Sequence, residues 1–376
     1  MPLQIAWRIL THQKGRTALA IGGIFVAILL IFVELGFFIA VPQGGLLIYD
    51  HMRFDLLLVS EKYIFQSESW QFPQARLTEA AKIAEVAQAS PVYLGGAKWQ
   101  DVAGGVRPDV AVFGFDPKAR VFAVPDIDRQ IDVLEKPDTV LVDSKTRAMF
   151  GPLETGRVVE IAGRRMTIGG QYVLGTGFLG LGVVLASEAN FFRMFPQRQP
   201  DAVNLGLVTL KPGADPDQVA RELRAALAKG VQVFTRPEIE AHEVAFWTTR
   251  TATGLIFGSG LIVAFVVGIM VLYQTLATQI TRQLPQFATL KAVGYTNGFL
   301  DGIVLVEALL FVLVAFVPAL VAALGVYAVI RSQTLLPASL TATQLGAVFG
   351  ITLLMSVISA FLSVGRLRRA DPADIF

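Results

Sequence analysis

The sequence predicts a helical membrane protein with four spans, both of whose termini lie on the same side, and a large α+β domain inserted between the first two spans. Composition is the first observation behind this fold class. The 376 residues are 53% apolar with a mean hydropathy of +0.56, too high for a soluble protein and too low for a chain lying wholly in a membrane. Four apolar runs are each long enough to cross a bilayer. Residues 42–250 contain no such run and mix charges, prolines and short strand patterns.

Charge and side-chain inventory argue against several classes of function. The net charge of +2 does not suit a nucleic-acid-binding protein. The chain has no cysteine, so disulfides, thiolate metal sites and a cysteine nucleophile are excluded. Its three histidines, His12, His51 and His242, are far apart in sequence, so we expect no metal site.

The first elements are an amphipathic segment and a span. Residues 1–16 place Leu3, Ala6, Trp7 and Leu10 on one helical face, which predicts a helix lying on the cytoplasmic membrane surface. Residues 17–41 form the first span. A cleavable signal peptide is rejected because the apolar run is too long and no small-residue cleavage pattern follows it.

Residues 42–250 are expected to form the water-exposed domain, with a strand–helix–strand unit near each end. Asp215 and Pro216 suit the N-cap and first position of a helix that Gly230 closes. Two such units provide the material of a small α+β layer. The expected strands are 54–60, 92–100, 110–115, 202–210 and 231–235, and the other expected helix is 74–89.

A β-rich insert is expected inside this domain, over about residues 119–199. The flanking parts, about 50–118 and 200–240, would form the outer α/β portion. Short strand patterns occupy 139–143, 157–162, 166–173 and 183–186, with a turn at Gly163.

Three spans complete the chain, over residues 251–280, 302–330 and 342–365, with Pro318 expected to kink the third span of the protein. A loop over 281–301, a short loop over 331–341 and a tail over 366–376 connect and follow them.

The distribution of basic residues predicts the orientation. Most basic residues near the spans lie at the two termini and in the 281–301 loop, whereas the short loop over 331–341, on the other side of the membrane, has only Arg331. The positive-inside rule therefore places both termini and the 281–301 loop in the cytoplasm. The large domain then lies outside, in the periplasm of a Gram-negative cell. The basic residues of the inner side are Arg8, Lys14, Arg16, Arg282, Lys291, Arg366, Arg368 and Arg369.

The polar stretch Arg282–Gly294, RQLPQFATLKAVG, is the most distinctive part of the sequence. Pro285 suits the first position of a separate short helix, and Gly294 suits the left-handed position after its end. Apolar residues recur between them every three positions. Such a helix can insert into a groove on a soluble partner, or can serve as a turn lying on the head groups. The recurring residues are Leu284, Phe287, Leu290 and Val293.

No motif makes a positive case for an enzyme. The chain lacks a phosphate-binding P-loop. Residues 175–180, GTGFLG, match G-x-G-x-x-G by letters, but no helix pattern follows them, so a glycine turn is favoured. The pair His242–Glu243 lacks the second histidine of a zinc protease motif, and no Ser/His/Asp set is indicated.

Two carboxylates within the spans are functional candidates, because charge inside a membrane is costly. Glu34 is expected near the outer interface and Glu307 near the inner surface, with Lys291 or Arg282 as its partner. Solvated interfacial carboxylates without a function are the alternative.

A face of small residues in the second span can allow close helix packing between two copies of the chain. Such spacing is also frequent by chance in apolar helices. The residues are Gly254, Gly258, Ala264 and Gly268.

The arrangement of one span, a large external domain and three spans resembles the FtsX-like (MacB-type) permease family of ABC transporters, and is most similar to its DevC-type members. The similarity covers the whole chain. It is most specific in Leu284–Tyr295, LPQFATLKAVGY, in Glu307 within VLVEALL, and in Arg368–Phe376, RRADPADIF. The external stretches VLVDSKTRAMFG and GRVVEIAGRRMTIGG also resemble the family's periplasmic core domain.

This resemblance implies a non-catalytic inner-membrane subunit that forms a homodimer and binds two copies of a separate ABC ATPase, which would hold the ATP and Mg²⁺. No cofactor is expected in this chain. The external domain would correspond to the Porter and Sabre subdomains, with the β-rich insert as the Sabre. The segment between spans two and three would be the coupling helix that transmits ATPase closure mechanically to the periplasmic domain. Its residues would be Leu284, Pro285, Phe287, Leu290, Lys291, Val293 and Gly294.

The DevC-type similarity implies export of a lipid or other amphiphile, through a membrane-fusion protein and a TolC-like outer-membrane duct. FtsX-like signalling to a cell-wall hydrolase and lipoprotein release from the inner membrane are the alternatives within the same architecture. A membrane-anchored structural protein without an ATPase is a further one. The sequence does not name the substrate.

Overall fold

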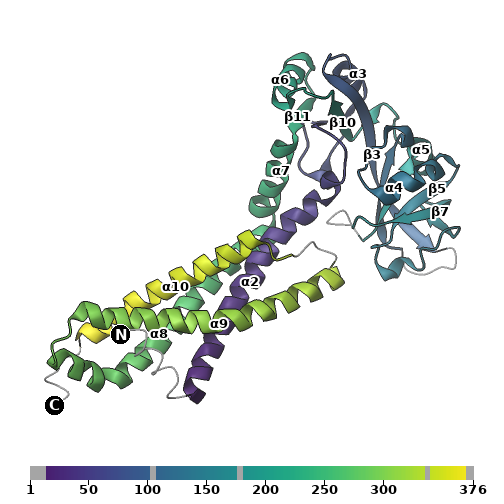
Figure 1. Cartoon of the computed structure of the whole chain (residues 1–376). Coiled ribbons are helices and arrows are strands. Elements are labelled where there is room, and N and C mark those ends of the chain that lie inside the picture. Colours follow the sequence, from purple (N-terminus) through teal and green to yellow (C-terminus); the bar gives the residue numbers. More distant parts are fainter. Residues whose placement is uncertain (1–13, 102–106, 176–180, 335–338, 370–376) are drawn as a thin grey trace. The chain divides into compact units, whose positions relative to one another are not determined.

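The computed structural model describes residues 14–101, 107–175, 181–334 and 339–369. Most of the expected interfacial helix over 1–16 lies outside these residues, as do 176–180 of the glycine-rich stretch, 335–338 of the short loop and 370–376 of the tail. The chain divides into two compact units (Figure 1). One unit comprises Met1–Val41 and Ala252–Phe376, and the other is Pro42–Thr251.

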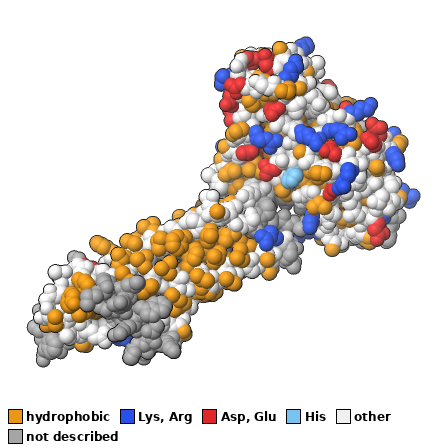
Figure 2. All heavy atoms as spheres, viewed as in Figure 1, with side chains coloured by type: hydrophobic (Ala, Val, Ile, Leu, Met, Phe, Trp, Pro, Cys, Tyr) orange, Lys and Arg blue, Asp and Glu red, His pale blue; other side chains and the backbone are white. Residues whose placement is uncertain are grey.

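Four helices are long and apolar enough to cross a membrane, as the sequence predicts: α2 (Lys14–Asp50), α8 (Ala252–Ala292), α9 (Asn297–Thr334) and α10 (Ala342–Arg369). Helices that are apolar on every side are typical of membrane spans. Exposed hydrophobic side chains lie on all four helices, and Figure 2 shows them covering the visible face of this unit, whereas charged side chains gather on the other unit.

Apolar and small side chains pack the helices of the first unit together. Ile28, Leu272, Phe311 and Met355, one from each helix, belong to a single buried cluster. Helix α10 turns small hydroxyl side chains toward the interior, and Ser359 Oγ donates a hydrogen bond to the backbone carbonyl of Ile269 in α8 at 3.1 Å. Small residues let the helix backbones approach closely where lipid provides no hydrophobic driving force.

The second unit is built on a nine-stranded sheet in the order β11-β1-β10-β3-β4-β8-β5-β7-β6. Strand β3 pairs with β10 at its beginning, with β4 along its middle and with β6 at its end. The β3–β6 pairing closes β3, β4, β8, β5, β7 and β6 into a ring. The strands are β1 (Leu56–Ser60), β3 (Val86–Asp101), β4 (Asp109–Phe115), β5 (Thr139–Asp143), β6 (Val158–Ile161), β7 (Arg164–Tyr172), β8 (Val183–Ser187), β10 (Leu205–Leu210) and β11 (Val231–Thr235), with β2 (Phe72–Pro73) and β9 (Ala202–Val203) paired separately.

The expected β-rich insert over 119–199 therefore shares its sheet with the flanking segments. Strand β8 pairs in parallel with β4, and β6 extends the far end of β3. The hairpin between β6 and β7 turns at Ala162 and Gly163, both with positive φ (53° and 76°), the conformation of the two-residue turns that suit twisted hairpins.

Helices cover both faces of the sheet. Helices α3 (Ala75–Ala80), α5 (Glu188–Met194) and α6 (Pro216–Ala226) contribute to the core on one face. The end of α2, with α4 (Pro125–Gln130) and α7 (Arg236–Ala245), contributes to the core on the other.

Local signals predicted the start of α6 correctly, whereas the helix ends at Ala226 and not at the expected Gly230. Asp215 caps it by accepting a hydrogen bond from the Asp217 N–H at 3.0 Å, Pro216 is its first residue, and Val219 and Leu223 are buried. The expected helix over 74–89 is wrong in its second half, because Val86 begins strand β3. Pairing of this segment with β10, for example Ala89 with Val208, outweighs the helical propensity of its alanines.

Candidate coupling segment and buried polar groups

The expected separate helix at Pro285 is not formed, because α8 continues without a break from Ala252 to Ala292. A proline inside a helix removes one backbone hydrogen bond, so local preference favours an interruption. Packing opposes it: Leu276, Ile280 and Phe287 are buried on the same core before and after the proline. This shared buried face carries the helix through the predicted boundary.

The predicted end of this helix at Gly294 is confirmed. Gly294 has a φ of +105°, which favours glycine. The Tyr295 N–H donates to the Leu290 carbonyl at 3.1 Å and the Gly294 N–H to the Lys291 carbonyl at 3.0 Å, the pattern of a Schellman motif. The backbone then turns sharply, and α9 begins at Asn297.

The apolar stripe of the segment does not form one free face. Phe287 is 4% exposed and packs into the helical core, Leu284 and Leu290 are half-buried against that core, and Val293 is 74% exposed. Residues six positions apart on an α-helix differ in direction by about 120°. A three-residue spacing therefore rotates around the helix, which is why Phe287 and Val293 have opposite environments.

The free face of the segment is formed by other residues. Arg282, Pro285, Gln286, Thr289 and Val293 are exposed, and their spacing of three or four places them along one side of α8. Lys291 is half-buried. This mixed polar and apolar face is the one that the helical unit leaves open.

Glu307 lies inside the helical core and not at a solvated surface. It is 1% exposed, and its Oε1 atom has no hydrogen-bond partner among the residues that the structure describes. Within the described part of the chain, neither Lys291 nor Arg282 forms the expected ion pair with it. A buried carboxyl group without an ion pair is costly, so Glu307 stays a functional candidate.

Glu34 of α2 is half-buried against α8. A Cβ atom built at Gly260 would overlap the Glu34 carboxylate, so the absence of a side chain at Gly260 makes the room for this group. The sequence did not single out Gly260, because its role depends on the pairing of two helices.

The small-residue face predicted for a dimer packs inside the protomer, so that assignment is wrong. Ala264 is buried, Gly258 lies 3.3 Å from the Phe38 ring, and Gly268 contacts the Met355 sulfur. Gly254 is also buried. The spacing does mark close packing, as expected, but the partners are helices of the same chain.

A buried polar cluster that the sequence did not reveal joins the end of α2 to α7. The hydroxyl oxygens of Tyr49 and Tyr63 lie 2.7 Å apart, and the Tyr63 hydroxyl donates to Glu243 Oε1. Burial raises the pKa of Glu243 to about 7 and raises the pKa of Tyr63 well above its ordinary value. The three residues come from separate segments, so no spacing could have predicted the cluster.

Arg236 provides a second connection between the same elements. Its guanidinium donates to the carbonyls of Tyr49 at 3.2 Å and Met52 at 2.9 Å, and lies 4.2 Å from the Phe54 ring centroid. It thereby provides hydrogen bonds to carbonyl groups at and just after the end of α2, where helix carbonyls lack intrahelical donors. Helix α7, which precedes α8 in the chain, is thus tied by side chains to the end of α2.

Comparison with known proteins identifies both parts of the chain. Residues 17–226 match the MacB-like periplasmic core domain, and residues 258–372 match the FtsX-like permease C-terminal domain. No curated protein matches the chain.

Several solved structures are similar to about half of the chain. The periplasmic region of MacB from Actinobacillus actinomycetemcomitans is 8% identical with a TM-score of 0.38, covering 52% of this chain and 94% of that one. The extracellular domain of the ABC-type transporter YknZ from Gram-positive bacteria is 14% identical with a TM-score of 0.35, covering 48% and 99%. A domain described as a permease protein from Porphyromonas gingivalis is 16% identical with a TM-score of 0.30, covering 47% and 85%. At these identities and TM-scores, the solved structures assign no role to any residue of this chain.

The family predicted from the motifs is therefore confirmed, whereas the closer similarity to DevC-type permeases stays a prediction. The first family match spans more than half of the chain, and the second spans most of the remainder. The chain belongs to the MacB-type, FtsX-like family of ABC transporter permeases.

Proposed function

We propose that the chain is the non-catalytic permease subunit of an ABC exporter of the inner membrane. A homodimer would bind two copies of a separate ATPase, which hold the ATP and Mg²⁺. Closure of the ATPases would change the conformation of the α/β unit, in the periplasm, and drive a lipid or other amphiphile through a membrane-fusion protein and a TolC-like duct.

The length of α8 is the observation that carries the proposal. Its 41 continuous residues correspond to about 60 Å of helix, whereas the hydrocarbon core of a bilayer is about 30 Å thick. The helix begins directly after the α/β unit and ends at the coupling segment. A helix of this length supports mechanical transmission, because displacement of one end displaces the other.

The burial pattern supports different tasks for the two sides of the coupling segment. Gln286, Thr289 and Val293 are exposed and would contact the ATPase. Phe287 and the half-buried Leu290 would connect the segment to the permease's own core, instead of occupying an ATPase groove. Force on the exposed side would then reach α9 and α10 through buried contacts.

The exposed side provides the direct test. Val293→Asp places a charge on the proposed contact surface without removing a buried side chain. We expect co-purification of the ATPase with the solubilised permease to fall at least tenfold, with normal permease levels in the membrane. Thr343→Asp, an exposed position at the start of α10 near the other end of the bundle, is the matched control. Equal ATPase recovery with Val293→Asp and wild type would refute the coupling role.

The same purification, read by mass spectrometry, distinguishes the exporter from the alternative functions of this architecture. An ATPase together with a membrane-fusion protein supports the exporter. An ATPase with a cell-wall hydrolase instead indicates signalling, and lipoproteins retained in the inner membrane of deletion cells indicate lipoprotein release. Absence of any ATPase contradicts the proposal as a whole.

A further inference from the structure

A cavity of about 920 Å³ lies on the α/β unit, over strands β3 and β4. The cross-strand pairs Leu94–Phe113 and Gly96–Ala111 form its floor, because directly paired residues of antiparallel strands project to the same face. Gly96 is exposed, and a Cβ atom built there would meet no atom of the described residues within 4 Å. The floor is therefore apolar, with open space above Gly96.

Trp70 forms one wall of the cavity in a conformation that packing alone does not explain. Its backbone φ is +51°, a region in which bulky residues are strained. Its side chain is 54% exposed, so it also forgoes much of the favourable burial of an indole ring. The Lys62 ammonium lies 5.6 Å from the ring centroid. Strained backbone of this kind is concentrated at ligand sites.

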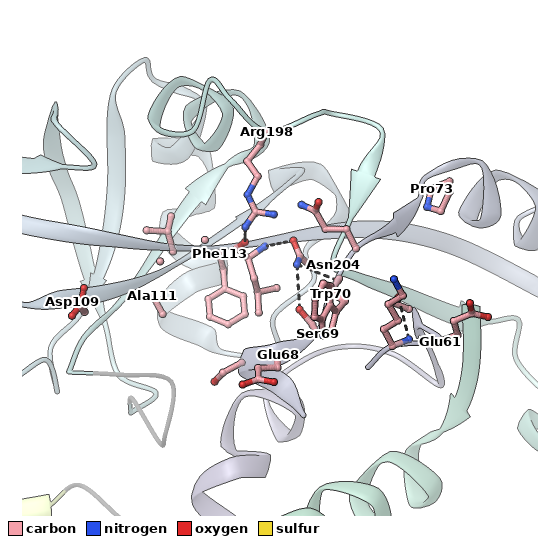
Figure 3. A pocket seen from close by; sticks show the side chains of 18 of the residues that line it. Glu61, Glu68, Ser69, Trp70, Pro73, Asp109, Ala111, Phe113, Arg198 and Asn204 are labelled. Atoms are coloured by element: carbon pink, nitrogen blue, oxygen red, sulfur yellow. Dashed lines mark hydrogen bonds between the residues drawn. The ribbon is translucent and has the colours of Figure 1, made fainter. Parts of the chain in front are cut away.

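A buried amide holds Trp70 beside the floor (Figure 3). Asn204 Nδ2 donates to Ser69 Oγ at 3.2 Å and to the Trp70 carbonyl at 3.3 Å, while its Oδ1 accepts from the Leu94 N–H at 2.9 Å. One buried side chain thus connects the strained segment to strand β3. The wall and the floor are held together before any ligand arrives.

Arg198 provides a cation beside the same floor. Its Nη2 donates to the Leu94 carbonyl at 2.8 Å, and burial lowers the pKa of the guanidinium from its ordinary value. No carboxylate among the described residues forms an ion pair with it. A guanidinium has five N–H donors, so donors remain for a ligand. An anion placed there would offset the cost of its partial desolvation.

The carboxylates that line the cavity leave the Arg198 end positive. Asp109 is paired with Lys98 at 2.7 Å, and Glu61 accepts a hydrogen bond from the Gly230 N–H at 3.1 Å. Figure 3 shows Glu68 on the other side of Phe113 from Arg198. The cavity therefore has one cationic end and an apolar centre.

We propose that this cavity binds an amphiphile with an anionic head group, which contacts Arg198 while the apolar chain lies over Gly96 against Trp70. Its volume falls within the range of roughly 300–1,000 Å³ that is usual for small-molecule sites. The inference rests on the proposed export function and names the chemical class of its substrate.

Tryptophan quenching by a brominated probe tests the site. The full chain, purified without lipid in an amphipathic polymer, is titrated with 11-bromoundecanoate, whose bromine quenches a tryptophan that it contacts. We expect saturable quenching that disappears in Trp70→Phe. Arg198→Gln should weaken binding about tenfold, as expected for loss of a charge-assisted hydrogen bond. Arg221→Gln removes an exposed arginine of α6 outside the cavity and should leave binding unchanged.

A second variant tests the floor. Gly96→Leu fills the open space and should abolish the Trp70 quenching. Circular dichroism should stay unchanged, because Gly96 has no positive φ and the new Cβ would meet no neighbour in the described part of the chain. The neutral 11-bromoundecanol and the cationic 11-bromoundecyl-trimethylammonium should bind at least tenfold more weakly than the acid. Equal binding of the three probes, or of wild type, Arg198→Gln and Gly96→Leu, would overturn the proposal.

ATPase recovery from the same preparations separates this inference from the proposed function. Wild-type protein that co-purifies with its ATPase but shows no Trp70 quenching contradicts the cavity alone. Saturable quenching in a chain that recovers no ATPase contradicts the exporter alone. Loss of quenching in Gly96→Leu with normal ATPase recovery supports both.

Discussion

Glu243 shows how a single buried residue can give the α/β unit a pH-dependent stability. It is fully buried in the cluster with Tyr49 and Tyr63. Burial favours its neutral form, and no arginine or lysine forms an ion pair with it among the described residues. The other charged or titratable residues of α7 are Arg236, Glu238, Glu240 and His242. Arg236 bonds to carbonyls of the α2 end, Glu238 pairs with Arg224, and the His242 ring lies 5.6 Å from that of Tyr63.

We predict that the contribution of Glu243 to the stability of the α/β unit falls as the pH rises from about 4.5 to about 7. The folded-state pKa of Glu243, about 7, lies above its ordinary value of 4.5, so between these values the folded state holds a proton that the unfolded state has released. This contribution is then greatest below pH 4.5 and falls by up to about 3 kcal/mol by pH 7. Glu243→Gln should flatten this slope in unfolding followed by near-UV circular dichroism. Glu240→Gln, on the same helix, is the control, and an unchanged slope in Glu243→Gln would contradict the assignment.

At the scale of elements, the long α8 combines a membrane span with the proposed coupling segment in one helix. Sequence preferences at Pro285 favour an interruption, but burial of Ile280 and Phe287 on a common core continues the helix. The C-terminal Schellman motif then fixes where it stops. The proposed coupling segment is therefore continuous with the span in one helix, which suits transmission of force along that helix.

We predict that Phe287→Ala destabilises the helical unit by about 3 kcal/mol or more, because it removes a buried aromatic side chain from the core. Val293→Ala should change stability by less than about 0.5 kcal/mol, since that side chain is exposed. Thermal unfolding in detergent, followed by size-exclusion chromatography, compares the two. Similar losses in both variants would mean that the burial pattern of the segment is different from the one described.

At the scale of the whole molecule, the apolar helices and the charged α/β unit are separate compact units with different solvents. The orientation that follows from the basic residues places them on a definite side of the membrane. This orientation stays a prediction, and the cysteine-free sequence makes it directly testable.

We predict that single cysteines at Asp132 and Thr343 react with a membrane-impermeant maleimide in intact cells, or in spheroplasts if an outer membrane is present. A cysteine at Val293 should react only after the membrane is opened. All three positions are exposed, so accessibility within the chain does not bias the comparison. Labelling of Val293→Cys from outside would mean that the orientation is the reverse of the predicted one. It would also exclude contact of this segment with a cytoplasmic ATPase.

The sequence by itself determined the four spans, the family and several local boundaries, because these depend on apolar run length and on the φ angle or hydrogen bond of one residue, as at Asp215 and Gly294. Only the tertiary structure decided which side of the coupling segment is free, because Phe287 and Val293 are equally apolar and differ only in what packs against them. The same reason applies to the Glu243 cluster, to the small-residue face of α8 that packs inside the protomer, and to the Trp70–Arg198 cavity. Each brings together residues from segments far apart in the chain, where strand pairing and helix packing, and not local spacing, set the distances.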